Sequence, residues 1–146
     1  MTQDYFGTKR VTAWHAEKDG AAGYGVKYAD GHQSWSPAEA FEAAYRPITS
    51  MSFGHAIEAL KAGHKVARHG WNGKGMFLFV TAGSSPIDPD ERATLIDGVP
   101  SVLFDFGDTG TSTRMPQITM HTATGSSVAW TVSQTDALAE DWCIVE

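Results

Sequence analysis

The chain has 146 residues, enough for one domain with a hydrophobic core or for a smaller domain that carries an N-terminal addition. Hydrophobic residues make up 42% of it and charged residues 19%, which is typical of globular rather than disordered proteins. The formal charge of -6 and the lack of a Lys/Arg stripe argue against sequence-independent nucleic-acid binding, so we expect no nucleic-acid partner. With one cysteine, no signal-peptide pattern and no membrane-length apolar segment, we expect a cytosolic protein with no membrane partner.

Residues 1–49 are interpreted as a separate small N-terminal unit of the ββα type. Alternation over residues 9–15 predicts a strand. Residues 23–28 and 33–35 predict a hairpin, because the Asp30-Gly31 pair between them supplies the positive φ that a tight turn needs.

A helix is predicted at the end of this unit. Ser36 is a natural N-cap, Pro37 suits the first helical position, and Glu39 completes a capping box. The helix is expected to run through Tyr45 and to stop before Pro47.

Residues 50–146 are predicted to form a second unit that begins with an amphipathic helix. Its apolar positions recur at the spacing of one helical face, and they are Phe53, Ala56, Ile57 and Leu60. The helix should begin near Ser52 and end where Gly63 favours a left-handed C-terminal cap.

Strands are predicted for most of the remainder. Residues 64–71 and 76–81 are expected to pair through a tight turn at residues 72–75, and residues 115–122 and 127–132 form a second hairpin. Residues 83–113, rich in proline and acidic residues, are predicted as a long variable loop with one strand embedded in the apolar patch 99–106.

The C-terminal segment is predicted to contain a short capped helical turn and a final strand. Ser133 with Asp136 three residues later resembles a capping box that opens a turn through Ala139, and residues 142–145 alternate as a strand. The sequence thus predicts an α+β fold, with an antiparallel β-sheet and one main amphipathic helix behind the small N-terminal unit.

No catalytic or metal-binding constellation stands out. The six histidines lack the paired spacing of metal ligands, Cys143 reads as a packed strand residue, and Gly70 to Gly75 depart from a phosphate-loop pattern because a strand follows Lys74. Pairing of the carboxylates of Asp136 or Asp141 in space stays open, with capping and solvated helix ends as the simpler interpretations. We therefore predict neither a cofactor nor a metal ion.

The residues that indicate binding cluster in two strings, GWNGKGMFLFV from Gly70 and AWTVSQTDALAEDW from Ala129. Trp71 and Trp130 at strand ends can stack on a base or pack in the core, and these alternatives stay open for Trp71. Asn72 and Gln134 carry both a donor and an acceptor, although turn and cap roles explain them equally well. Arg68 and Lys74 are candidate phosphate contacts, and the remaining alternative is that they are exposed strand-edge charges.

These two strings, within the blocks MSFGHAIEALKAGHKVARHGWNGKGMFLFV and MPQITMHTATGSSVAWTVSQTDALAEDW, resemble the second family of Thoeris anti-defence proteins of phages. The resemblance spans residues 51–146 around the variable loop. It implies a non-enzymatic sponge that sequesters 1''-3' glycocyclic ADP-ribose, a cyclic nucleotide signal made from NAD in the infected bacterium, and in some members cyclic dinucleotides as well. It also implies a homotetramer that acts in the host cytoplasm.

The resemblance carries a set of expected ligand contacts onto this chain. They are Trp71, Asn72, Met76, Phe77, Trp130, Gln134, Thr135 and Asp136, with Arg68 and Lys74 as weaker phosphate candidates. Thr131-Val132 and Ala137 depart from the residues usual in the family, which leaves ligand preference open. The rival hypothesis is a phosphodiesterase or ADP-ribosyl hydrolase that destroys the signal with Asp136 or a loop acid and a histidine base. A phage structural protein is a third reading.

Overall fold

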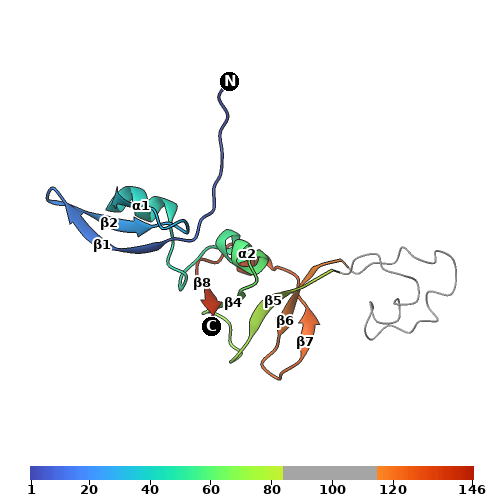
Figure 1. Ribbon diagram of the computed structural model, residues 1–146. Coiled ribbons are helices and arrows are strands. Elements are labelled where there is room, and N and C mark those ends of the chain that lie inside the picture. The colour runs from blue at the N-terminus through green and yellow to red at the C-terminus, as the bar shows by residue number, and fades with distance from the viewer. Residues whose placement is uncertain (84–114) are drawn as a thin grey trace, which may run out of the picture.

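The computed structural model describes residues 1–83 and 115–146, and in this part of the chain it confirms the predicted α+β fold. Two antiparallel sheets follow one another along the sequence (Figure 1). The first has the strand order β1-β2-β3 and the second the order β7-β6-β5-β4-β8. Apart from Gly83, the predicted loop 83–113 lies outside the described residues, and its apolar patch 99–106 lies outside them entirely.

The N-terminal sheet is a meander of β1 (Thr12–Lys18), β2 (Ala21–Lys27) and β3 (Gln33–Pro37). A second tight turn that the sequence analysis did not single out joins β1 to β2. Asp19 has φ 51° and Gly20 has φ 80°, so both central residues take the left-handed conformation that two-residue hairpin turns require. Strand β1 therefore lies further along the chain than the predicted strand at residues 9–15.

The predicted capping box at the start of α1 (Ala38–Ala44) is wrong. The N-cap position is occupied by Pro37, and no side chain caps the helix. Ser36 instead belongs to β3, where its backbone pairs opposite Tyr24, and Pro37 pairs opposite Gly23. Strand pairing with residues far away in sequence therefore overrides the local helix-start signal.

Helix α1 covers one face of this sheet through an aromatic stack. The ring of Tyr24 on β2 lies 4.3 Å from that of Phe41, which in turn lies 4.7 Å from Tyr45. The Tyr24 hydroxyl donates a 2.8 Å hydrogen bond to Glu42. These contacts fix α1 on the side of the sheet to which Tyr24 points.

Helix α2 (Phe53–Lys61) has the predicted ends. The Ser52 hydroxyl accepts a hydrogen bond from the backbone N–H of His55, and Gly63 beyond the C-terminus has φ 91°. The buried face of α2 presents Ala56 and Leu60 to the second sheet.

The second sheet consists of β4 (Lys65–Arg68), β5 (Phe77–Thr81), β6 (Gln117–His121), β7 (Ser127–Ala129) and β8 (Trp142–Val145). Val66, Leu78 and Trp142 are fully buried with Leu60 and Met51, and they form the core between this sheet and α2. Because side chains alternate along a strand, Phe77 and Phe79 lie on the opposite face, which α2 does not cover.

The predicted tight turn at residues 72–75 is wrong, because β4 ends early at Arg68 and a longer loop over residues 69–76 leads to β5. Two hydrogen bonds pull the chain away from β5 at this point. His69 donates its backbone N–H to the carbonyl of Asp141 at 3.1 Å, and Gly70 donates to the Asp141 carboxylate at 2.7 Å. The loop is thereby directed toward the segment that precedes β8.

Candidate functional site

Three tryptophans meet edge to face where the two motif strings come together. Ring centroids are separated by 5.4 Å for Trp71 and Trp142, 6.1 Å for Trp130 and Trp142, and 6.5 Å for Trp71 and Trp130. Phe53 of α2 lies 5.2 Å from Trp142 and 6.0 Å from Trp130. Trp142 is buried, whereas Trp71 and Trp130 are half-buried, so each of these two contributes to the core and keeps part of its ring at the surface.

The short helix α4 (Gln134–Ala137) is tied to this cluster by Asp136. Its carboxylate Oδ1 accepts a 3.1 Å hydrogen bond from Trp71 Nε1, and its backbone carbonyl accepts one of 2.9 Å from Trp142 Nε1. Ser133 caps α4 as predicted, since its hydroxyl accepts from the Asp136 N–H and donates to Asp136 Oδ2. Ser133 thus supplies the cap, whereas the Asp136 carboxylate accepts from side chains and positions Trp71.

Arg68 at the end of β4 joins two carboxylates. Its Nη1 donates to Asp136 Oδ1 at 2.8 Å, its Nε to Asp141 Oδ1 at 2.8 Å, and its Nη2 to Asp141 Oδ2 at 3.4 Å. The side chains of Arg68 and Asp136 are only 14% and 15% exposed. Three of the five guanidinium N–H donors are therefore engaged within the chain, and contact of the other two with a phosphate stays a prediction.

The charges of this network reinforce one another. The hydrogen bonds that Arg68 donates to Asp141 and Asp136 raise the pKa of Arg68. The Arg68 guanidinium lowers the pKa of Asp141. Partial burial acts to raise the pKa of Asp136, but hydrogen bonds from Arg68, Ser133 and Trp71 outweigh burial and hold it below its usual value. Both carboxylates are therefore ionised at neutral pH.

Four of the expected contacts are exposed and lie close along the chain to Trp71 or Asp136. Asn72 and Lys74 belong to the loop after Trp71, and Gln134 and Thr135 belong to α4 beside Asp136. Within the described residues, none of these four side chains has a hydrogen-bond partner, so their polar groups are available to a ligand.

The structure separates Phe77 from the tryptophans. Phe77 lies on the sheet face away from α2, where it stacks on His121 at 4.8 Å and sits 5.2 Å from the ammonium of Lys65. Met76 packs against Gly73 within the loop. In one chain, Phe77 therefore belongs to a different surface from Trp71.

Sequence reasoning did not identify several of the partners that build these surfaces. The sequence predicts a helix-end acid at Asp141, whereas the structure makes Asp141 the main partner of Arg68. His121 and Lys65 beside Phe77 were not singled out either. In the structure, His121 on β6 pairs opposite Phe77 on β5. The predicted strand character of both segments is the one sequence signal that points to this contact.

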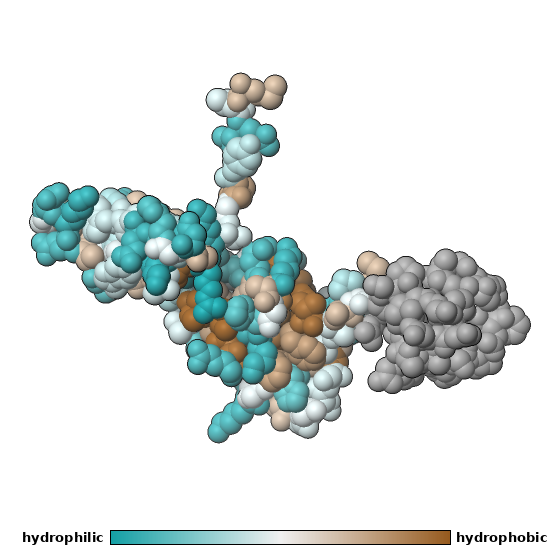
Figure 2. All heavy atoms as spheres, viewed as in Figure 1, coloured by the Kyte–Doolittle hydropathy of each residue, from teal (hydrophilic) through white to brown (hydrophobic). Residues whose placement is uncertain are grey.

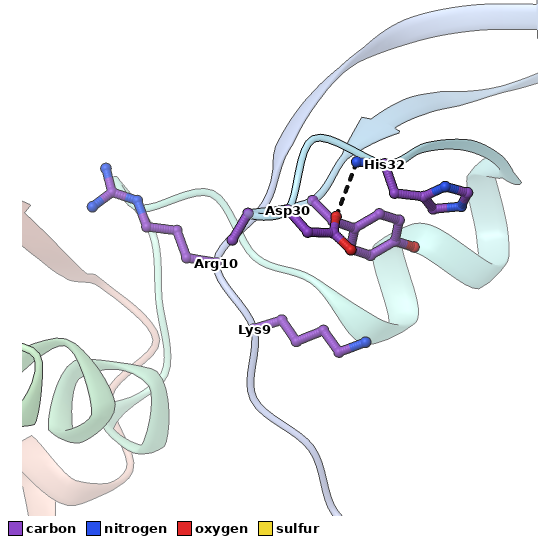
Figure 3. Close-up of a pocket in the computed structure, with 6 residues that line it drawn as sticks. Lys9, Arg10, Asp30 and His32 are labelled. Atoms are coloured by element: carbon purple, nitrogen blue, oxygen red, sulfur yellow. Dashed lines mark hydrogen bonds between the residues drawn. The ribbon is translucent and has the colours of Figure 1, made fainter.

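Two open depressions occur on the described part of the chain, and neither is lined by an expected ligand contact. One, of about 520 Å³, is lined by Lys9, Arg10, Tyr28, Ala29, Asp30 and His32. Figure 3 shows that Lys9 and Arg10 point in different directions, and Arg10 reaches His64 at 3.2 Å, so the two cations do not form a common anion site. The other, of about 300 Å³, is lined by His15, Ala16, Glu17, Ala22 and Gly23.

The described residues contain neither a metal-binding cluster nor a membrane-length apolar helix. Among residues 1–83 and 115–146, no group of three or more histidine, cysteine or acidic side chains is arranged to hold a metal ion. No helix in the same part of the chain has the length and apolar character to cross a membrane.

Comparison with known proteins identifies the second sheet and its surroundings. Residues 51–145 match the Tad2-like family, described as a Thoeris anti-defense 2-like domain. A protein of Bacillus phage SP01 called Thoeris anti-defense 2 is 43% identical over 98 residues, which are 66% of this chain and 97% of that protein. The residues that match the family, 51–145, do not include the N-terminal sheet. The chain belongs to the Thoeris anti-defense 2-like family.

Proposed function

We propose that the protein is a phage anti-defence sponge, which binds a nucleotide immune signal in the cytoplasm of the infected bacterium and sequesters it without cleaving it. The observation that carries the proposal is the pair of half-buried indoles, Trp71 and Trp130, of which Trp71 is anchored by Asp136, together with exposed polar side chains on the loop after Trp71 and on α4. Partly exposed aromatic rings with a few polar groups are suited to a base and a ribose. Membership of the family supports the anti-defence role.

The ligand expected from the family resemblance is 1''-3' glycocyclic ADP-ribose, with cyclic dinucleotides as a further possibility. In this proposal Trp71 and Trp130 contact the base, and Gln134, Thr135 and Asn72 contact ribose or base edges. Lys74 is the exposed cation next to them and is assigned to a phosphate.

A binding role is favoured over a hydrolytic one by the state of the carboxylates. A general acid at neutral pH needs a raised pKa, whereas both Asp136 and Asp141 have lowered pKa values and bind Arg68. Neither is hydrogen-bonded to a histidine in the described part of the chain. These features suit a fixed framework that holds indoles in place.

We further propose that the site is completed in a homo-oligomer, with the tetramer of the family as the expected state. In the described part of the chain no helix covers the face of the second sheet that carries Phe77 and Phe79, and neither depression described above is lined by the expected contacts. Figure 2 shows that apolar surface gathers on the part of the molecule around the second sheet rather than on the N-terminal unit. A second copy that covers this face would bring Met76 and Phe77 to a ligand site that one chain does not complete. We also propose that residues 1–49 and 50–146 are two separate structural units.

The test is isothermal titration of the full chain with glycocyclic ADP-ribose and with a panel of cyclic dinucleotides, followed by heat denaturation and chromatography of the released ligand. A sponge gives saturable binding and returns the ligand intact. Recovery of a linear product would instead establish the hydrolase, and no binding heat with any ligand would refute the proposal. Light scattering of the same sample tests the oligomeric state.

Variants sharpen this experiment. Asn72→Ala and Gln134→Ala remove exposed polar groups that make no hydrogen bond to a described residue, so they are expected to weaken binding while leaving the melting temperature unchanged. Glu140→Ala, an exposed change near α4, is the matched control. Equal affinities of all three variants would refute the assigned contacts.

A further inference from the structure

The N-terminal sheet has a second face that no other described element covers. Helix α1 occupies the side to which Tyr24 points, and Figure 1 shows no helix or strand on the other side. Side chains of that other side come from alternate strand positions. Its central row, set by the strand register, is Trp14 opposite Gly25 opposite Trp35.

Two glycines on β2 leave room for the indole rings of this face, because they carry no Cβ. A Cβ at Gly25 would collide with the indole of Trp14, and a Cβ at Gly23 would collide with the indole of Trp35. Both glycines are buried in consequence, whereas Trp14 remains 45% exposed. The two rings therefore lie over backbone rather than against side chains, with area left open to solvent.

Trp35 is also anchored by its one polar group. Its Nε1 donates a 3.1 Å hydrogen bond to the carbonyl of Ala16 on the far strand, so the indole spans the sheet. With that N–H already used, Trp35 offers a ligand its π surface and no donor. This suits stacking against a planar ring better than recognition of sugar hydroxyls or peptide carbonyls, which require donors.

The charged side chains on this face are lysines. In register order, its rows are Thr12, Lys27 and Gln33, then the tryptophan row, then Ala16, Gly23 and Pro37, and last Lys18 and Ala21. None of these strand residues is acidic, and the Lys18 ammonium lies 5.8 Å from the centroid of Trp35. Lys18 and Lys27 are separated by about six residues of strand, or roughly 20 Å. That span exceeds one nucleotide and matches a chain of phosphates.

We propose that this face, formed by Trp14, Trp35, Lys18 and Lys27, binds single-stranded nucleic acid, with bases stacked on the two indoles and phosphates near the two lysines. Exposed aromatic rings on an antiparallel sheet with flanking cations are a general solution for single strands. The expectation of no nucleic-acid partner rests on the net charge of the whole chain. Stacking provides binding energy that net charge does not measure, and this proposal is independent of the sponge function.

The experiment is fluorescence anisotropy of the full chain with a labelled oligothymidylate of about ten nucleotides at low salt, beside a duplex of the same length. We expect saturable binding of the single strand and weaker binding of the duplex. Trp14→Ala should raise Kd at least about fivefold, and Trp14→Phe should restore most of the affinity. Lys18→Glu and Lys27→Glu should each raise Kd and flatten its dependence on salt.

The matched controls are Tyr5→Ala, which removes another exposed aromatic ring, and Lys61→Glu, which reverses an exposed lysine on α2. Neither should change the affinity. No binding by the unaltered chain, equal binding of the duplex, or an equal loss in Tyr5→Ala would overturn the proposal. So would a proline-rich peptide that binds this face while the oligonucleotide does not. Titration with glycocyclic ADP-ribose keeps the two proposals apart, because Trp14→Ala should leave it unchanged.

Discussion

Replacement of Asp136 by alanine tests whether the network around Arg68 holds the candidate site together. The change removes the acceptor of three donors, which are Arg68 Nη1 at 2.8 Å, Trp71 Nε1 at 3.1 Å and the Ser133 hydroxyl at 2.7 Å. A hydrogen bond to a charged group contributes about 1.5–3 kcal/mol, and a neutral one about 1 kcal/mol. Arg68 keeps Asp141, so its charge is not left unpaired.

Because Arg68 keeps Asp141 and water can replace the carboxylate as a partner of the exposed Ser133 hydroxyl, the expected loss in the free energy of unfolding is about 2 kcal/mol, below the simple sum of the three hydrogen bonds. For a domain of this size, that corresponds to a fall of roughly 10 °C in the melting temperature. Asp136→Asn keeps an oxygen for the Trp71 N–H but removes the charge, and we expect about half the effect. Ligand affinity should fall in Asp136→Ala, because Trp71 loses its acceptor and its orientation, and should fall less in Asp136→Asn, which keeps an acceptor for Trp71.

Urea denaturation followed by tryptophan fluorescence measures this loss, because three of the five tryptophans lie in the cluster that Asp136 joins. Glu140→Ala is the matched control, an exposed acidic residue in the same segment, and should change stability by less than about 0.5 kcal/mol. If Asp136→Ala destabilises the protein no more than Glu140→Ala does, Asp136 does not hold the site together and the reasoning fails.

Three further predictions concern the two acidic partners of Arg68, the core and the N-terminal sheet. Asp136 and Asp141 have pKa values below the unfolded value of about 3.9, so the stability that they contribute is complete above about pH 5 and is lost as the pH falls through the folded pKa values. Urea midpoints measured from about pH 6 downward should therefore decline less steeply in Asp136→Asn than in the unaltered chain. Parallel declines would contradict this. Leu78→Ala empties a fully buried position and should cost about 2–5 kcal/mol in urea denaturation, whereas a loss under about 1 kcal/mol would show that the core collapses around it. Gly25→Ala drives a methyl group into the Trp14 indole and should destabilise the N-terminal sheet by about 1–3 kcal/mol, seen as a loss of the near-ultraviolet circular dichroism signal at a lower urea concentration. An unchanged spectrum and stability would contradict the packing of the Trp14 ring on Gly25.

The elements predicted well from the sequence are those whose signals are local. Ser52 and Gly63 mark the ends of α2 through bonds and dihedral angles within one turn of the helix. Ser133 caps α4 through its own near neighbour Asp136, and the alternation in residues 142–145 matches β8. The family could also be recognised from the two motif strings, and the match of residues 51–145 confirms it.

The failures occurred where a distant partner competes with a local signal. Ser36 has a good capping sequence but pairs with Tyr24 in the sheet, and residues 69–71 have strand character but are drawn away by Asp141. Both competing contacts join residues that are remote in sequence. No periodicity within a short window contains that information.

For the candidate site, the sequence determined which chemical groups are available, namely indoles, amides, hydroxyls and a lysine. It showed no evident catalytic centre among them. Only the tertiary structure decided how they are used. It joined Arg68, Trp71 and Asp136 into one network, placed Phe77 on the opposite sheet face, and laid Trp14 and Trp35 over glycines. The physical reason is that side-chain type is a local property, whereas direction, burial and pairing depend on strand register and on contacts across the fold.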